Sequence, residues 1–255
     1  MITTKSEEEI ARIEAAGRVV AEALQAMRDA IVPGKTTTND LENTAIAVLT
    51  KHGAVSPFFG YQPPHHPPYP AWTCISVNEE VVHGVPGRRV LNEGDIVGCD
   101  VGAKLDGFYA DAAWTFPVGR VSPEAERLLK VGEEALYTGI AAAKPGAHVG
   151  DIGAAIQRFV HRHGYSVVRE MVGHGIGRAL HEEPQVPNFG KPGHGPLLRE
   201  GMTICIEPMV NAGGHAIQAL SDEWTIVTSD RSLSVHFEHT VAITRNGPRI
   251  LTRGN

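Results

Sequence analysis

The sequence predicts a mixed α+β fold built from two structurally similar halves. Two long segments, 6–31 and 123–143, have the pattern of helices, and each ends near a Pro-Gly pair that a second, shorter helix follows. Runs rich in β-branched and aromatic residues come after each helix pair, with turn signals between them. The order helix, Pro-Gly, helix, strands therefore occurs twice in a chain of 255 residues.

The first helix is predicted over residues 6–31. Ser6 and Glu9 have the spacing of a capping box, in which each side chain accepts the backbone N–H of the other residue. Apolar residues recur along the segment near helical spacing, and Pro33 ends it. A second helix is expected at about 40–52, with a glycine directly after it.

The second half repeats this order, with helices predicted at 123–143 and about 151–163. In the first half Asp40 lies twelve positions before His52, and in the second Asp151 lies twelve positions before His163. We therefore expect a single domain over residues 1–255, made of pseudo-repeat halves of about 1–120 and 121–255, with a site between them.

Strands are predicted where β-branched and aromatic residues gather: 73–77, 95–102, 107–116, 202–207, 224–228 and 238–243. The tetrapeptide at 104–107 has the composition of a hairpin turn. A turn centred between Leu105 and Asp106 would place Asp100 opposite Asp111, on one side of the sheet. Two carboxylates in that position would repel each other unless a cation lay between them.

Five residues form a candidate metal site: Asp100, Asp111, His174, Glu207 and Glu238. Apolar residues flank four of the five, and a buried carboxylate is costly unless it is paired or binds a metal. Four carboxylates and one imidazole make an oxygen-rich set whose negative charges balance two divalent cations. Any one of these acids alone is more often an ordinary edge or turn residue, so the hypothesis depends on the whole set.

Two further histidines lie in distinctive loops, His83 in NEEVVHGVP and His181 in GRALHEEP. Their imidazoles titrate near neutral pH, so they could hydrogen-bond a substrate or move protons. The glycine-rich segment around His174 only loosely resembles a phosphate-binding loop, because no Lys-Ser/Thr pair follows it. Cys74 is interpreted as pocket lining rather than as a nucleophile, because no catalytic partner can be named for it.

Composition excludes several classes of function. The formal net charge is -6 and no run of lysine and arginine is present, which argues against nucleic-acid binding. The acidic N-terminal segment MITTKSEEEI does not resemble a targeting peptide, and no apolar stretch is long enough for a membrane helix. Three widely spaced cysteines do not make a disulfide framework and are expected to be free and buried. We therefore expect a cytoplasmic protein.

Five motifs together resemble type I methionine aminopeptidases of the bacterial kind, which belong to the pita-bread metallopeptidases. They are CISVNEEVVHGVP, GDIVGCDVGAKLDGFYADAAWTF, GHGIGRALHEEPQVPNFG, GMTICIEPMV and DRSLSVHFEHTVAIT, and the similarity covers nearly the whole chain. The resemblance implies the pita-bread fold, with two pseudo-symmetric α/β halves around a central antiparallel sheet.

The resemblance also implies a role for each candidate metal residue. Asp111 and Glu238 would bridge two divalent ions, His174 and Glu207 would complete the ligands of one ion, and Asp100 would chelate the other. Cobalt, manganese, iron and zinc all accept such a set, so the sequence does not identify the metal.

Further roles follow from the same resemblance. His83 and His181 would contact the substrate and assist proton transfer, and Glu207 would be the general base. A pocket for a methionine side chain would be lined by Tyr61, Tyr69, Cys74, Leu180 and Trp224, because a thioether packs well against aromatic rings.

The implied activity is metal-dependent removal of the initiator methionine from nascent polypeptides when the second residue is small. The protein would meet these N-termini at the ribosome and would be a monomer. One alternative is a prolidase or Xaa-Pro aminopeptidase of the same fold, although such relatives carry a large additional N-terminal domain. The other is an inactive pita-bread protein that only binds partners, although such a protein would be expected to lose ligands.

The chain departs from the family pattern in two places. Residues 62–68, Gln-Pro-Pro-His-His-Pro-Pro, form a short insertion beside the expected pocket and put the position of Tyr61 in doubt. Val235, His236 and Phe237 stand where the family more often has a small residue, glutamine and tyrosine. An imidazole two residues before Glu238 would either influence that carboxylate directly or face away from it.

Overall fold

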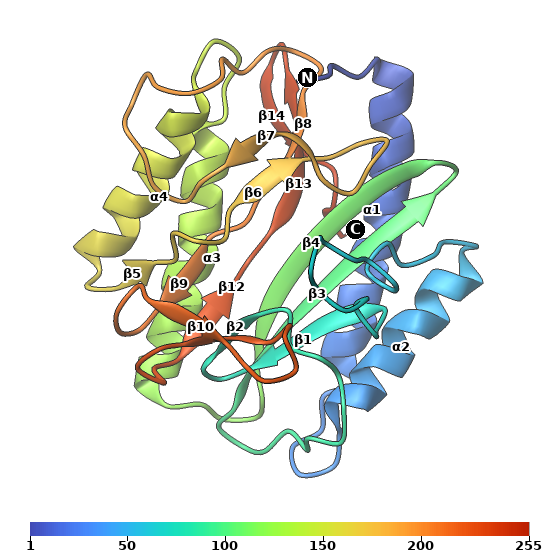
Figure 1. Cartoon of the computed structure of the whole chain (residues 1–255), viewed down its shortest axis with the longest axis vertical. Coiled ribbons are helices and arrows are strands. Elements are labelled where there is room, and N and C mark those ends of the chain that lie inside the picture. Colours follow the sequence, from blue (N-terminus) through green and yellow to red (C-terminus); the bar gives the residue numbers. More distant parts are fainter. Residues whose placement is uncertain (255) are drawn as a thin grey trace.

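Antiparallel strands lie between two pairs of helices in the computed structural model, which describes residues 1–254 (Figure 1). The helices are α1 (Glu7–Asp29), α2 (Thr38–Lys51), α3 (Pro123–Ala142) and α4 (Val149–Arg162). The strands of the first half are β1 (Thr73–Val77), β2 (Glu80–Val82), β3 (Ile96–Leu105) and β4 (Phe108–Pro117). Those of the second half are β5 (Ser166–Val167), β6 (Gly173–Gly175), β7 (Glu182–Val186), β8 (Thr203–Ile206), β9 (Met209–Asn211), β10 (Ile217–Ala219), β11 (Ile226–Thr228), β12 (Ser234–His236), β13 (His239–Thr244) and β14 (Gly247–Ile250).

Side-chain caps set the helix boundaries. The predicted capping box at the start of α1 is present, with the Ser6 hydroxyl accepting the Glu9 N–H and the Glu9 carboxylate accepting the Ser6 N–H. Helices α2 and α4 each begin two residues before the predicted start, so that Asp40 and Asp151 are the third residues of these helices and not the first. Each aspartate lies in the first turn and accepts the backbone N–H of the residue that precedes the helix.

The same equivalence holds at the other end of the two short helices. His52 and His163 are the C-terminal cap residues of α2 and α4, and the glycine that follows each has a left-handed backbone, with φ of 69° and 82°. The twelve-residue spacing is therefore the distance, within one short helix, from the aspartate of its N-terminal capping box to its C-terminal cap residue. The division of the domain into two similar halves stays a prediction.

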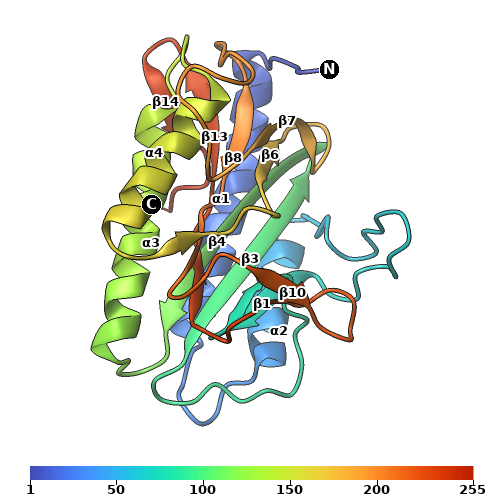
Figure 2. The same cartoon turned by 60° about the vertical axis from the view of Figure 1, so that its left-hand side comes forward.

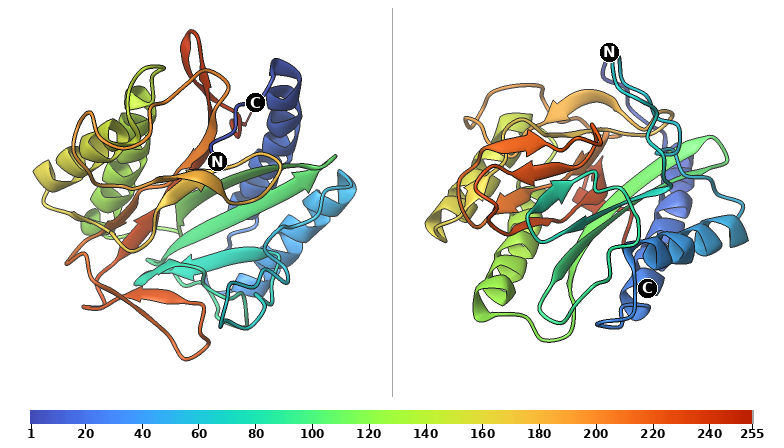
Figure 3. Two further views of the ribbon diagram at one scale, coloured as in Figure 1. Left: turned by 45° about the horizontal axis from the view of Figure 1, so that its top comes forward. Right: turned by 60° about the horizontal axis from the view of Figure 1, so that its bottom comes forward.

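The long hairpin of β3 and β4 lies between α1 and β13 (Figure 3). Its turn is Asp106-Gly107, and both residues have positive φ, 48° and 82°, as a two-residue type I′ turn requires. Leu105 therefore pairs with Phe108, and the predicted pairing of Asp100 with Asp111 is wrong: Asp100 pairs with Ala113, and Gly102 with Asp111. Because the shift is two residues along β4, both carboxylates still point to the same side of the sheet.

Each helix pair covers its own part of the sheet. Helices α1 and α2 pack with β1, β3 and β4 around one apolar core, whereas α3 and α4 pack with β8, β12 and β13 around another. Strands β14, β13, β8, β6 and β7 form a five-stranded antiparallel sheet. All six predicted strands exist: β1 has the predicted boundaries, and the other five differ from prediction by up to three residues. The second half also contains short strands that the sequence pattern does not indicate. Within residues 1–254, no helix is both long and apolar enough to span a bilayer.

Two threonines connect the first half to the second. The Thr240 hydroxyl on β13 accepts the Asp111 N–H and donates to the Asp111 carbonyl, at 3.0 and 2.8 Å. The Thr115 hydroxyl on β4 does the same for the backbone of His236, at 3.0 and 2.8 Å. Between them, the Glu238 N–H donates to the Ala113 carbonyl at 2.8 Å. Strand β4 is thus aligned antiparallel to the segment 236–240, and this alignment positions the functional site.

Candidate active site

Neighbouring strands place the first three carboxylates close together. Cys74 pairs with Asp100, Asp100 pairs with Ala113, and the Ala113 carbonyl accepts the Glu238 N–H. These residues therefore lie in one line across β1, β3, β4 and the segment between β12 and β13. Asp111 lies in the next line, fixed by Thr240. Ligand atoms of Asp100, Asp111 and Glu238 lie within 4.8 Å of one another.

His174 and Glu207 come from the strands on the other side of the cavity. His174 is the central residue of β6, between two glycines that allow β6 to lie against its neighbours. A Cβ on Gly173 would be 2.4 Å from the Cys205 carbonyl, and one on Gly175 would be 2.3 Å from the Glu183 carbonyl. Glu207 follows β8 directly. The Gly-His-Gly motif is therefore a strand compressed between β7 and β8, not a phosphate-binding turn.

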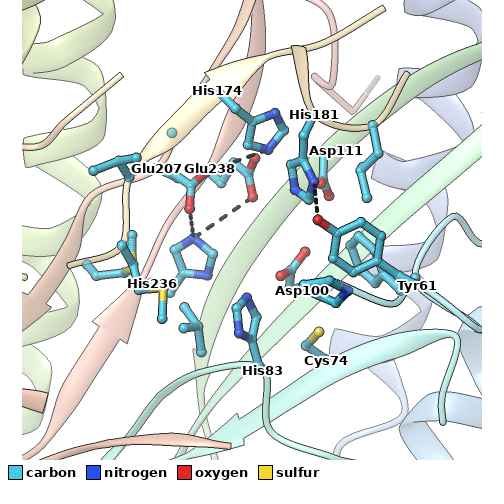
Figure 4. A pocket seen from close by; sticks show the side chains of 18 of the residues that line it. Tyr61, Cys74, His83, Asp100, Asp111, His174, His181, Glu207, His236 and Glu238 are labelled. Carbon is cyan, nitrogen blue, oxygen red and sulfur yellow. Dashed lines mark hydrogen bonds and ion pairs between the residues drawn. The ribbon is translucent and has the colours of Figure 1, made fainter. Parts of the chain in front are cut away.

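All five candidate ligands line one cavity of about 520 Å³, and His174 and Glu207 face each other within it (Figure 4). The His174 Nδ1 is 2.9 Å from the Gly175 carbonyl, so an Nδ1–H donates there and leaves Nε2 as a lone-pair donor toward the cavity. This Nε2 lies 3.7 Å from Glu207 Oε1. Cys205 Sγ is also within 4.8 Å of the nearest ligand atoms of His174 and Glu238.

The electrostatics of the cluster are unfavourable without a cation. Burial raises the pKa of Asp100 to about 7, and burial together with the neighbouring carboxylates raises the pKa of Asp111, Glu207 and Glu238 well above the ordinary value. Burial also lowers the pKa of His174 to about 3. One buried oxygen on each of Asp100, Asp111 and Glu238 has no hydrogen-bond partner within residues 1–254.

These observations fit divalent cations. Unpaired buried carboxylate oxygens directed at one another, together with a neutral imidazole, are the hard donor set that such ions prefer. Among residues 1–254, no lysine or arginine lines the cavity to balance the charge instead. The Cys205 thiol fits less well: its pKa is raised well above the ordinary value, chiefly by burial, and its sulfur lies 3.6 Å from the Thr240 hydroxyl.

His83 and His181 project into the same cavity from separate loops (Figure 4). His83 has a left-handed backbone, with φ of 59°, which is unusual for a residue with a side chain and marks a position that its surroundings hold in place. Burial lowers its pKa to about 4, so the ring is neutral at pH 7. His181 Nδ1 lies 3.1 Å from the Tyr61 hydroxyl, and its ring packs edge-on against His174.

One end of the cavity is apolar and largely aromatic. The Tyr69 ring packs edge-on against Trp224 at 5.1 Å, and the Tyr69 hydroxyl donates to the Thr73 and Gly84 carbonyls. Cys74 and Leu180 belong to the same apolar cluster. All the residues predicted to line a methionine pocket are therefore found on this cavity: Tyr61, Tyr69, Cys74, Leu180 and Trp224.

The insertion at 62–68 leaves this pocket intact. The Gly60 N–H donates to the Tyr69 carbonyl and the Tyr69 N–H donates to the Tyr61 carbonyl, both at 2.9 Å. These two bonds close the base of the loop, which projects from the body of the molecule (Figure 2). Both tyrosines consequently reach the cavity, although Tyr61 is partly exposed.

The sequence analysis did not identify several lining residues, among them Phe58, Met171, Met209 and, as a member of the site, His236. The first three are ordinary apolar residues in their local sequence, which gave no signal. His236 did stand out as a departure from the family pattern, and its imidazole points into the site (Figure 4).

The comparisons with known proteins agree with this geometry. Residues 11–245 match the model of metallopeptidase family M24. The chain belongs to this family. Methionine aminopeptidase 1 of Bacillus subtilis is 47% identical over 253 residues, covering 99% of this chain and 100% of that protein. M24 proteins are metallopeptidases, so membership makes the chain a metal-dependent hydrolase, in agreement with the donor set.

Solved structures of M24 proteins confirm the pita-bread fold. A methionine aminopeptidase from Thermotoga maritima superposes with a TM-score of 0.95 at 46% identity and covers 99% of this chain and 100% of its own. A prolidase from Pyrococcus horikoshii superposes with a TM-score of 0.78 at 24% identity, and the match spans 64% of that chain. The second likeness shows the shared fold alone.

Proposed function

We propose that this protein is a methionyl aminopeptidase that removes the N-terminal methionine from polypeptides. One observation carries the proposal: the carboxylate cluster and an aromatic, apolar group of residues line a single cavity. A peptidase that removes one apolar residue needs a pocket for that side chain beside the groups that cleave the bond, and this cavity contains both. The relatives in Bacillus subtilis and Thermotoga maritima, both named as methionine aminopeptidases, support the same substrate.

Two divalent ions would occupy the carboxylate cluster. Asp111 and Glu238 would serve both, as the resemblance to methionine aminopeptidases implies. In support, Glu238 has ligand atoms within 4.8 Å of those of Asp100 and Asp111 and also of His174. His174 and Glu207 would complete the ligands of one ion and Asp100 those of the other. Such ions polarise a peptide carbonyl and make a water molecule more acidic. Cobalt, manganese, iron and zinc are the candidates, because each accepts oxygen ligands with an imidazole.

The side chains around the cluster would orient the substrate and move protons. Glu207 would be the general base, as the resemblance to methionine aminopeptidases implies, because a carboxylate beside the peptide bond can accept a proton from the attacking water. His83 and His181 are directed at the space between the cluster and the aromatic pocket (Figure 4). As neutral rings they can hydrogen-bond the peptide on either side of the bond that breaks.

The aromatic pocket would select methionine. A thioether is apolar and polarisable, and it gains contact energy against Tyr69 and Trp224 that a charged or branched side chain would not. A small second residue would be required, as the resemblance to methionine aminopeptidases implies, and His236 and Met209 also line the cavity. Substrates would be nascent chains met at the ribosome, by a monomeric protein of the cytoplasm, in keeping with its three buried, free cysteines.

Peptide hydrolysis tests the proposal directly. Metal-free protein is supplied in turn with each candidate metal and offered Met-Ala-Ser, Met-Ile-Ser and an Xaa-Pro peptide. We expect metal-dependent release of methionine from Met-Ala-Ser alone. Cleavage of the Xaa-Pro peptide would indicate a prolidase-like enzyme instead. Folded, metal-loaded protein that cleaves none of them would refute a peptidase function and favour a binding protein.

A further inference from the structure

His236 is a buried imidazole that the donor set described above leaves out. The residue is 4% exposed, and its Nε2 has no hydrogen-bond partner within residues 1–254. An unpaired buried nitrogen forfeits its hydration without any compensating bond, which is rare in folded proteins. The ring lies at the edge of the carboxylate cluster and is directed at Glu207 and Glu238 (Figure 4).

The backbone around His236 holds the ring in that direction. The Thr115 hydroxyl bonds both the N–H and the carbonyl of His236. Side chains two residues apart on an extended segment point the same way, so His236 faces the cavity with Glu238, whereas Phe237 points into the core between them. The backbone therefore fixes the side of the sheet on which the imidazole lies.

The distances from Nε2 fall within the range of separations between donors that share a cation. Nε2 lies 3.7 Å from Glu207 Oε2 and 3.9 Å from Glu238 Oε2, both too long for a hydrogen bond. With bonds of about 2.1 Å, two donors on one ion lie about 3.0 Å apart when adjacent in an octahedron, about 3.4 Å apart in a tetrahedron and about 4.2 Å apart when opposite.

The second imidazole of the site provides an internal comparison. His174 Nε2 lies 3.7 Å from Glu207 Oε1, and His236 Nε2 lies 3.7 Å from Glu207 Oε2. Glu207 thus lies between two imidazoles, one at each of its oxygens and at the same separation. If His174 Nε2 is a metal ligand, His236 Nε2 has the same separation from the carboxylate that both imidazoles face.

We propose that His236 is a sixth protein donor of the metal centre, and that it supplies Nε2 to an ion held by Glu207 and Glu238. This inference rests on the proposed metal centre and adds to it a preference among metals. Imidazole suits zinc, iron and other late transition metals, whereas a purely carboxylate set suits manganese and magnesium. A second imidazole therefore biases the centre toward cobalt, zinc or iron and against manganese.

The rival explanation is an ordered water molecule between His236 and the two carboxylates. Gaps of 3.7 and 3.9 Å leave room for such a bridge. A glutamine in the same place would donate to that water equally well, but its amide is a weaker metal ligand than imidazole. His236→Gln therefore separates the two explanations while preserving the size and polarity of the side chain.

Metal binding to metal-free protein tests the proposal without reference to activity. Titration calorimetry is run with Co²⁺, Zn²⁺ and Mn²⁺ on the wild type, His236→Gln and His236→Ala. His239→Gln is the matched control, because His239 is equally buried but bonds Thr252 and does not line the cavity. We expect both His236 variants to lose about tenfold or more in Co²⁺ and Zn²⁺ affinity with little change for Mn²⁺. The control should bind all three metals as the wild type does.

Proton NMR of the Co²⁺-loaded protein gives a second readout, which needs only the wild type and His236→Gln. Two strongly shifted imidazole N–H signals are expected in the wild type and one in the variant. One signal in both proteins, or an equal loss of Co²⁺ and Mn²⁺ affinity, would overturn the ligand role in favour of the water bridge. A wild type that binds no metal would refute the metal centre itself, which is a different outcome.

Discussion

Removing the ammonium group of Lys5 should destabilise the protein and loosen the segment that carries His181. Lys5 Nζ lies 2.6 Å from Glu182 Oε2, and both side chains are nearly inaccessible, at 4% and 14% exposure. The other oxygen of Glu182 accepts the N–H groups of Arg178 and Ala179. One carboxylate therefore connects the N-terminal segment to residues 178–182, of which Leu180, His181 and Glu182 line the cavity of the candidate site.

The size of the effect follows from the burial of this ion pair. Replacing Lys5 by methionine keeps the apolar stem but leaves the Glu182 carboxylate buried without its partner. Breaking a buried pair on one side costs about 3–5 kcal/mol. For a protein of this size that is a fall of roughly 6–20 °C in melting temperature. The exposed pair of Lys51 with Glu22 is the matched control, and Lys51→Met should cost less than about 1 kcal/mol.

The effect should also depend on pH. Burial acts to raise the pKa of Glu182, but the Lys5 hydrogen bond and charge, with the Arg178 N–H, outweigh it and bring the pKa below its ordinary value of 4.5. A carboxylate with a lowered pKa stabilises the fold above its unfolded pKa and loses that contribution as the pH falls through the folded pKa. The difference between the wild type and Lys5→Met should therefore be full at pH 7 and shrink below about pH 4.5.

Urea unfolding at pH 7 and pH 4, with kcat and KM for Met-Ala-Ser, measures both parts of the prediction. We expect a lower free energy of unfolding at pH 7 and a reduced kcat, because His181 is no longer held in place. The double variant Lys5→Met, Glu182→Gln should recover part of the stability, since no buried charge remains unpaired. Equal stability of Lys5→Met and wild type at pH 7, or a loss no larger than that of Lys51→Met, would refute the reasoning.

Three further predictions concern the site and its support. Asp111→Asn should abolish metal binding and activity, yet it should raise the melting temperature of the metal-free protein at pH 7.5, because it removes a buried carboxylate that its neighbours repel. Burial raises the pKa of Asp111, so this gain in melting temperature should be smaller at pH 5, where the wild-type carboxyl group is more protonated. Calorimetry of metal-free samples at both pH values measures the difference. His83→Ala should lower kcat by about 10²–10⁴-fold with both ions retained, and metal analysis that finds an ion missing would make His83 a ligand instead. Glu42→Ala should lower the free energy of urea unfolding by about 3–5 kcal/mol and raise KM for methionyl peptides. The reason is that the Glu42 carboxylate accepts the N–H groups of Trp72 and Thr73 at the start of β1, the strand that carries Cys74. A variant with the wild-type stability and the wild-type KM would contradict this prediction.

The sequence predicted what depends on neighbouring residues. Helix caps involve residues three positions apart, so Ser6 with Glu9 could be identified from their spacing, and Asp40 and Asp151 differed from expectation only in their position within the first turn. The chemistry of the site could also be predicted, because acids within apolar runs are costly unless they bind a cation or a partner. The resemblance to a family then gave each acid a role, and the cavity contains all of them.

The pairing of strands was less accessible to sequence reasoning. The type I′ turn at Asp106-Gly107 moved the register of the β3–β4 hairpin by two residues from the predicted pairing, because both turn residues adopt positive φ. The change kept Asp100 and Asp111 on one side of the sheet but placed them diagonally. The two-residue period of a strand determines the side of the sheet that a side chain faces, but it does not determine which residue of the neighbouring strand pairs with it.

Only the tertiary structure decided how the two ends of the site meet. Thr240 holds the backbone of Asp111 across 129 positions of sequence, and Thr115 holds that of His236 across 121. Neither threonine is unusual in its local sequence, and neither is Lys5, which reaches Glu182 from 177 positions away. Secondary-structure propensity, helix capping and hydrophobic periodicity act over a few residues, whereas these contacts form only when distant parts of the chain have packed together. The sequence by itself therefore determined the chemistry of the site, and the fold determined which further side chains, His236 among them, were brought into it.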